Sequence, residues 1–130
     1  YVASQIVKCM IKKDISVNGS NILVLGITFK ENCPDVRNTK AVDVISALKD
    51  YGSNITIHDP WADEKEVMYE FGLKSSREVP NGNFDAIILT VSHDKFKEVD
   101  LSSLMKEKVM VYDVKNFITN NFDITVDGQL

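Results

Sequence analysis

Four runs of β-prone apolar residues recur along the chain, and polar or helix-like segments separate them. Their extents predict strands at Asn21–Leu25, Asn54–His58, Asp85–Val91 and Val109–Tyr112. The first run contains ILVL and the third contains AIILTV, so apolar residues stand at consecutive positions rather than at every second one. Such runs are typical of parallel strands that are covered on both faces.

Helical spacing occupies much of the sequence between these runs. It predicts helices over residues 2–15, Thr39–Tyr51 and Asp63–Phe71, and shorter helical segments at Asp94–Val99 and Leu101–Lys106. Asn38 is a suitable N-cap for the second helix, and Gly52 follows its end. The tail after Phe117 is polar, with a weak strand signal at Asp123–Val126.

Strands that alternate with helices indicate a series of βαβ units. The predicted fold is therefore a Rossmann-like three-layer α/β/α sandwich with a mainly parallel sheet, formed by residues 1–130 as a single domain. The chain starts with YVAS, already inside a helical pattern. We expect it to be a piece of a longer protein, with residues 1–16 a leading helix from an interdomain connection.

Composition narrows the possible partners. The chain is 44% hydrophobic and 26% charged, as in ordinary globular domains, and its net charge of −4 argues against nucleic acid or an anionic membrane as the main partner. It has no apolar run near the roughly 20 residues that cross a bilayer. Two cysteines without metal-site spacing suggest a reducing compartment, so we expect a cytoplasmic protein.

The stretch Ile22–Asn38, ILVLGITFKENCPDVRN, is the most informative part of the chain. It runs from a buried strand into a polar connection that is much longer than the usual about two to six residues. Long ordered loops are disproportionately functional, and ligands of open α/β sheets bind at the carboxyl ends of the strands. We therefore expect a ligand site at this loop, together with the loops at Asp59–Trp61, Thr90–Asp94 and Asp113–Asn116.

The first strand does not end in a dinucleotide-binding turn. Its single Gly26 does not make the G-x-G-x-x-G pattern, and Asp59 lies farther along than the ribose-binding acid expected about 20 residues on. The sheet alone is therefore expected to bind NAD poorly.

Four side chains near the strand ends are candidate ligand contacts, and each has a structural alternative. Lys30 is either an anion contact or a solvated loop lysine, and Phe29 either stacks on a ligand or fills the core, the latter being favoured. Arg37 suits a pyrophosphate or a pairing with Asp35. Lys115 either converges with Lys30 on one anion or is an ordinary surface lysine.

The remaining reactive residue types do not form a catalytic set. Cys33 has no activating partner at a recognisable spacing, so a bystander thiol is favoured over a nucleophile, and Cys9 is assigned to the core. His58 and His93 are isolated and do not predict a metal site. Asp59 is interpreted as the residue of a strand-ending turn, and Trp61 as a packing residue.

The segments GITFKENCPDVRNTKAVDVISAL, ITIHDPWAD and VYDVKN resemble the C-terminal, UDP-sugar-binding domain of the UDP-glucose/GDP-mannose dehydrogenase family. The forms FKENCPDVRN and HDPWA look closest to the bacterial enzymes that act on UDP-N-acetylhexosamines for surface polysaccharides. The resemblance implies NAD-dependent oxidation of a sugar C6 alcohol to a carboxylate. It also implies an upstream NAD-binding domain, a middle domain used for dimerisation, and an intact enzyme that is a homodimer or larger.

The resemblance also implies roles for individual residues. Phe29 and Lys30 match the substrate-contacting pair, and Arg37 matches the arginine that reaches NAD bound by the other domain. Lys115 stands where the family has a substrate-binding arginine. A lysine at this position keeps the positive charge but cannot make the bidentate contact of a guanidinium. The nucleophilic cysteine of the family lies upstream of this segment, and Cys33 does not match it. This piece alone is thus expected to be catalytically inactive.

Two other functions remain open from the sequence. The chain could be a stand-alone nucleotide-binding or regulatory module, or an interaction domain without a small ligand. The substrate of the dehydrogenase alternative could be UDP-glucose, UDP-N-acetylmannosamine or GDP-mannose.

Overall fold

The computed structural model describes residues 1–37 and 39–130, and the side chain of Thr39 is not among the described ones. The N-cap predicted at Asn38 therefore lies outside the described residues. The described chain forms a six-stranded sheet in the order β3-β2-β1-β4-β5-β6, and every pair of neighbouring strands is parallel. The predicted Rossmann-like fold is confirmed, because this strand order is the dinucleotide-fold order.

The elements follow the sequence pattern closely in the first half of the chain. The strands are β1 (Asn21–Leu25), β2 (Asn54–His58), β3 (Ser75–Ser76), β4 (Phe84–Leu89), β5 (Met105–Asp113) and β6 (Gly128–Gln129). The helices are α1 (Val2–Lys12), α2 (Thr39–Asp50), α3 (Glu64–Phe71) and α4 (Ile118–Asn121), with 3₁₀ turns η1 (Asp94–Glu98) and η2 (Leu101–Leu104). Both β1 and β2 have the predicted bounds.

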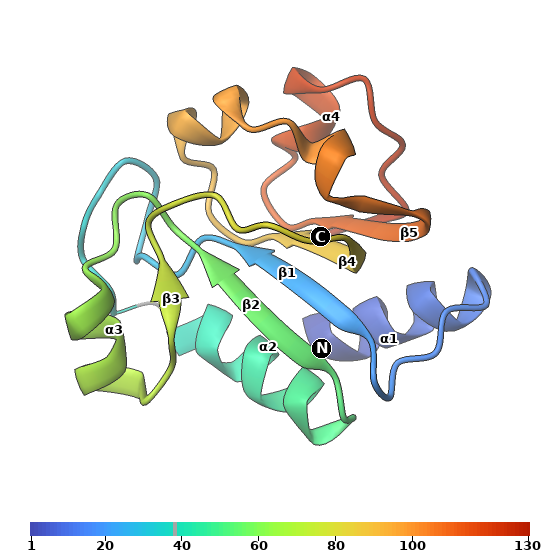
Figure 1. Ribbon diagram of the computed structural model, residues 1–130, viewed down its shortest axis with the longest axis horizontal. Helices are drawn as coiled ribbons and strands as arrows, with labels where there is room; N and C mark the ends of the chain where they lie inside the picture. The colour runs from blue at the N-terminus through green and yellow to red at the C-terminus, as the bar shows by residue number, and fades with distance from the viewer. Residues whose placement is uncertain (38) are drawn as a thin grey trace.

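The sheet separates two apolar cores. Strand residues alternate between them, so that in β1 Ile22 and Val24 face one core while Leu23 and Leu25 face the other. The first core is covered by α1, α2 and α3, and the second by η1, η2 and α4, as the helices below and above the sheet in Figure 1 show. Burial on both faces explains why these strands are apolar at consecutive positions.

Two predictions for the second half of the chain were wrong in detail. The weak strand signal at Asp123–Val126 does not mark a strand, and the tail instead contains α4 and the two-residue strand β6. The fourth predicted strand is longer: β5 begins at Met105, inside the helical segment predicted to reach Lys106, and its pairing to β4 has an irregularity. The charged residues Lys106–Lys108 at its start are exposed, so hydrophobicity alone does not reveal them as strand residues.

The connections of β1 reverse direction at the centre of the sheet. Neighbours β2 and β3 lie on one side of β1, and β4, β5 and β6 lie on the other. In such sheets the loops diverge at this switch point and leave a crevice at the carboxyl ends of the strands. Among the described residues there is no helix long and apolar enough to cross a membrane.

Candidate functional site

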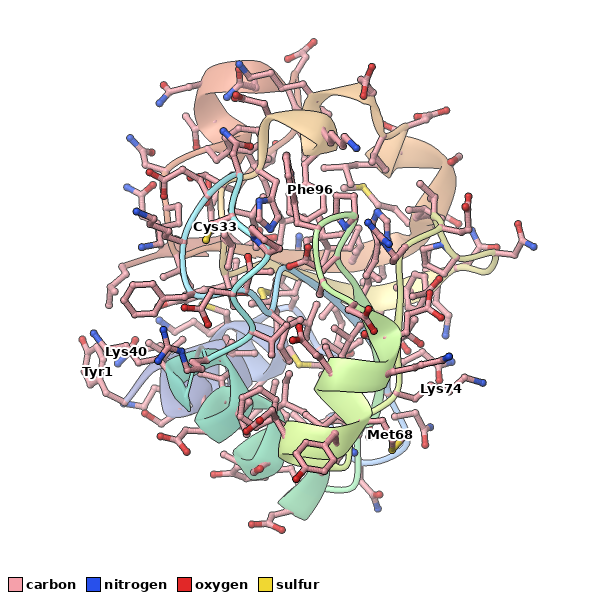
Figure 2. The ribbon with its side chains drawn as sticks, turned by 90° about the vertical axis from the view of Figure 1, so that its left-hand side faces the viewer. Tyr1, Cys33, Lys40, Met68, Lys74 and Phe96 are labelled. Atoms are coloured by element: carbon pink, nitrogen blue, oxygen red, sulfur yellow. The ribbon has the colours of Figure 1, made fainter. Side chains whose placement is uncertain are left out.

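The carboxyl edge of the sheet carries a cavity next to β1 and β4. It measures about 270 Å³, and its polar lining consists of Arg37, Lys40, Thr90 and Lys115. Phe29 and aliphatic side chains, among them Val44 and Val114, supply the apolar lining. Figure 2 faces this edge and shows Lys40 on the side of Tyr1 and Lys74 on the opposite side. The cavity combines three cations with an aromatic ring, a combination that suits a phosphorylated ligand with a flat ring.

The structure brings three of the four predicted contacts together. Phe29, Arg37 and Lys115 all line the cavity, whereas Lys30 is exposed and is not among the residues that line it. The predicted convergence of Lys30 with Lys115 is therefore not seen in this cavity. Phe29 is 60% exposed, so the favoured interpretation of this ring as core was wrong.

Arg37 is paired with Asp35, the structural alternative that the sequence left open. The Arg37 Nη2–Asp35 Oδ2 distance is 2.6 Å, and Arg37 Nε donates to the same carboxylate at 2.9 Å. The hydrogen bonds and charge of Arg37 lower the pKa of Asp35 to about 2. Because the Arg37 side chain is still 79% exposed, it can reach a ligand while it holds the loop.

Asp59 organises the loops at this edge and was underestimated from the sequence. It follows β2 and is fully buried, and its Oδ2 accepts the N–H groups of Ile27 and Thr28 at 2.8 and 3.1 Å. Its Oδ1 accepts from Trp61 N and Ala62 N at 2.8 and 3.2 Å. Burial opposes ionisation, but the hydrogen bonds from His93 and the backbone prevail and lower the pKa of this carboxyl.

His93 lies on the other side of the β1 loop. It is fully buried, with Nε2 3.0 Å from Asp59 Oδ2 and 2.9 Å from Thr28 Oγ1. The strand order β2-β1-β4 explains this meeting, because residues after β2 and β4 must flank the residues after β1. The sequence does contain a signal for this meeting, because Thr28, Asp59 and His93 each follow one of three adjacent strands. Considering each residue by itself does not reveal it.

The turn after β1 does not fit the pyrophosphate of a dinucleotide. Gly26 has φ +105°, and a Cβ at this position would lie 2.6 Å from the Cβ of Val91, so this glycine is needed for packing between strand ends. The next two N–H groups, which could otherwise face a phosphate, donate to Asp59. The residues present therefore do not form a phosphate cradle at the end of β1.

The fourth loop begins with a second buried carboxylate. Asp113 Oδ1 accepts from Lys115 N at 3.1 Å, and Asp113 Oδ2 accepts from Ile118 N at 2.7 Å. These bonds turn the chain after β5 and present Lys115 at the cavity. Lys40, in the first turn of α2, was not among the predicted contacts, because its spacing does not distinguish it from a lysine on a solvated helix face.

The remaining candidates stay apart from the cavity. Cys9 and Cys33 are both free thiols of intermediate exposure, and Cys9 packs against the first core as predicted. Trp61 packs near His93 with ring centroids 6.4 Å apart, and its indole N–H has no hydrogen-bond partner among the described residues. Within the described part of the chain, no group of three or more His, Cys, Asp or Glu is placed to hold a metal ion.

Comparison with known proteins gives the family. Residues 23–120 match the UDP-binding domain of the UDP-glucose/GDP-mannose dehydrogenase family. The chain belongs to this family. It is 47% identical over 118 residues to UDP-N-acetyl-D-glucosamine 6-dehydrogenase of Salmonella typhi and 42% identical to that of Pseudomonas aeruginosa, in each case over 88% of this chain and 28% of the relative.

Solved structures of family members share the fold. The NDP-N-acetyl-D-galactosaminuronic acid dehydrogenase of Methanosarcina mazei superposes with a TM-score of 0.75 at 21% identity, over 97% of this chain and 28% of that one. The UDP-D-ManNAc dehydrogenase of Pyrococcus horikoshii gives a TM-score of 0.69, with 98% and 29% covered. The chain thus spans less than a third of the length of these relatives.

Proposed function

We propose that this chain is the nucleotide-sugar-binding domain of an NAD-dependent UDP-sugar 6-dehydrogenase, which oxidises the C6 alcohol of a UDP-hexose or UDP-N-acetylhexosamine to a carboxylate. The observation that supports this most directly is the cavity at the switch point of the sheet. Arg37, Lys40 and Lys115 give it positive charge in a protein whose net charge is −4. A local concentration of cations attracts a diphosphate far more strongly than the whole molecule would.

The parts of the nucleotide sugar have matching groups in this site. The diphosphate pairs with Lys115 and Lys40, and the exposed ring of Phe29 offers a face for the uracil or the sugar. Lys30, beside Phe29, contacts the same substrate from the rim of the loop. Binding the nucleotide here positions the sugar C6 for reaction at groups outside this domain.

The cofactor belongs mainly to another part of the enzyme. Because the β1 turn of this chain does not fit a pyrophosphate, NAD is held by an N-terminal domain, and Arg37 contacts it across the cleft. The partners are therefore the NAD-binding and middle domains of the same chain, in an enzyme that is a homodimer or larger. Two free thiols suit a cytoplasmic enzyme.

The test is an amide NMR titration of the 130-residue chain with UDP, ADP and NAD, extended to millimolar concentration. UDP is expected to shift residues 26–37 and 113–116 more strongly than ADP does. Lys30→Ala and Lys115→Ala should weaken this response, and Lys115→Arg should retain it because a guanidinium can grip a phosphate in bidentate fashion. Lys74→Ala is the matched control, since Lys74 is an exposed lysine away from the cavity.

Two outcomes would contradict the proposal. A stronger response to ADP or NAD than to UDP would reject the substrate-binding assignment. No response to UDP, or one that both lysine variants leave unchanged, would favour an interaction domain. The stand-alone module would be favoured by a native polypeptide near 14.6 kDa, because the relatives predict one more than three times longer.

A further inference from the structure

Asn32 attaches the middle of the β1 loop to the loop that follows β4. Its backbone has φ +56°, a left-handed conformation that asparagine tolerates better than most residues. Its N–H donates to His93 Nδ1 at 2.8 Å. Its side chain exchanges two hydrogen bonds with Asp94, each of 3.0 Å. The loop is thus fastened to the residues that follow β4.

The contacts of His93 determine its tautomer. Since Nδ1 accepts the Asn32 N–H, it cannot carry a proton, and the proton of the neutral ring lies on Nε2. Nε2 then donates toward Asp59 Oδ2. His93 therefore links Asp59 and Asn32, as a donor at one ring nitrogen and an acceptor at the other.

The candidate substrate contacts lie between the two attachments. Thr28 is fixed by its N–H bond to Asp59, Asn32 is fixed by His93, and Phe29 and Lys30 come between them. Thr28 Oγ1 also donates to Lys30 O at 3.2 Å. The buried ring therefore limits where Phe29 and Lys30 can be, although it lines no part of the cavity itself.

We propose that His93 is a positioning residue for nucleotide-sugar binding, and that it acts by holding Asn32 and so pre-forming the loop segment with Phe29 and Lys30. The inference rests on the proposed function for its ligand. A loop that is already ordered loses less conformational freedom when the ligand binds, so affinity rises without a further contact. The function of His93 therefore depends on its acceptor nitrogen, Nδ1.

A purely structural histidine is the alternative. His93 packs against Phe96 with ring centroids 5.3 Å apart, and its Nε2 supports the buried Asp59. Two substitutions separate these roles. In His93→Gln the longer amide can reach the Nε2 position and still donate to Asp59, but the acceptor for Asn32 is lost. In His93→Asn the shorter amide can place its oxygen near the Nδ1 position and still accept from Asn32, but the donor to Asp59 is lost.

The experiment measures UDP affinity and stability of both variants of the 130-residue chain, and amide exchange at Asn32. His93→Gln is expected to weaken UDP binding about five- to tenfold, the worth of roughly one hydrogen bond, and to accelerate Asn32 exchange. His93→Asn should bind UDP within about twofold of the unmodified chain while being the less stable variant. His58→Asn is the control, because His58 is also buried and packs against the same Phe96, while its Nδ1 lies 3.0 Å from Ser76 O rather than against the β1 loop.

Equal loss of affinity in His93→Gln and His93→Asn would overturn the proposal, as would a fully retained affinity in His93→Gln. A measurement on the unmodified chain covers the case in which the variants do not fold. The ¹⁵N shifts of the His93 ring must show an unprotonated Nδ1 coupled to the Asn32 amide, and a protonated Nδ1 would reject the link. If UDP does not bind at all, the proposed function fails, while the ring shifts and Asn32 exchange still decide whether the link exists.

Discussion

Asp59 and Asp113 show how single buried carboxylates shape the ligand edge. Each follows or ends a strand, has no exposed surface, and accepts backbone N–H groups of residues that turn away from the sheet. A carboxylate offers about four acceptor positions, so one side chain can satisfy several turn donors that no strand or helix pairs. At Asp59 these donors come from two different loops, which couples the loop after β1 to the loop after β2.

Replacing Asp59 by asparagine tests this role. Asparagine keeps the shape of the side chain, but its amide nitrogen turns toward N–H donors and the negative charge is lost. We expect Asp59→Asn to lower the free energy of unfolding by about 3 kcal/mol, the range for charged hydrogen bonds and broken buried pairs. Urea denaturation measures this. Asp63→Asn is the matched control, because Asp63 caps α3 at an exposed position where asparagine caps equally well.

The same variant has a pH signature. Folding lowers the pKa of Asp59 below 3.8, so its contribution to stability is complete above the unfolded pKa and is lost as the pH falls through the lowered value. The unmodified chain should therefore lose stability on acidification more steeply than Asp59→Asn does. The measurement is the free energy of unfolding of both proteins as a function of pH. Equal slopes for the two proteins would show that the fold does not stabilise the charged form of this carboxylate.

At the scale of elements, the sequence predicted what hydrophobic periodicity can encode. β1 and β2 were predicted to the residue, since each is a buried run bounded by turn residues. The edge strands β3 and β6 are two residues long, too short for any period. Just before β6, Asp127 pairs with Lys13 of α1 at 3.0 Å and accepts from the Val111 amide of β5 at 2.9 Å. Such pairings depend on chain segments far apart in the sequence.

The site was predicted to a similar extent and for similar reasons. The length and charge of the β1 loop pointed to the edge of the sheet that carries the cavity, and Phe29, Arg37 and Lys115 do line this cavity. The link from Asp59 through His93 to Asn32 joins three loops, so it exists only once the strand order is known. Residue spacing in one sequence does not provide that order.

The turn after β1 allows a prediction about an element boundary. Gly26→Ala should destabilise the chain by about 3 kcal/mol or more, because it combines a left-handed φ of +105° with a clash against Val91 at 2.6 Å. Gly82→Ala is the matched control, since Gly82 has φ +124° and no atom within 4 Å of the added Cβ. The loss measured by thermal or urea unfolding should be clearly smaller there. Equal losses would mean that backbone conformation alone, without the Val91 contact, determines the need for glycine.

At the scale of the whole molecule, the described residues that line the cavity are binding groups rather than nucleophiles. Its cavity holds cations and an aromatic ring, its buried His93 has both nitrogens occupied, and its thiols lie outside the cavity lining. Cys33 lies within electrostatic reach of Arg37, but that guanidinium is already paired with Asp35 at 2.6 Å, and neither thiol has a hydrogen bond to a base among the described ones. We therefore expect the groups that carry out the oxidation to come from outside this chain.

The isolated chain is therefore expected to bind a UDP-sugar without oxidising it. Incubation with NAD and UDP-glucose or UDP-N-acetylglucosamine should produce no NADH above the rate without protein, because positioning alone does not supply a hydride acceptor site or a nucleophile. Cys33→Ser should leave UDP binding unchanged, which separates a bystander thiol from a participating one. NADH formation that depends on both the chain and the sugar nucleotide would refute the expectation that oxidation needs groups outside this chain. Loss of that activity in Cys33→Ser would then identify Cys33 as the nucleophile.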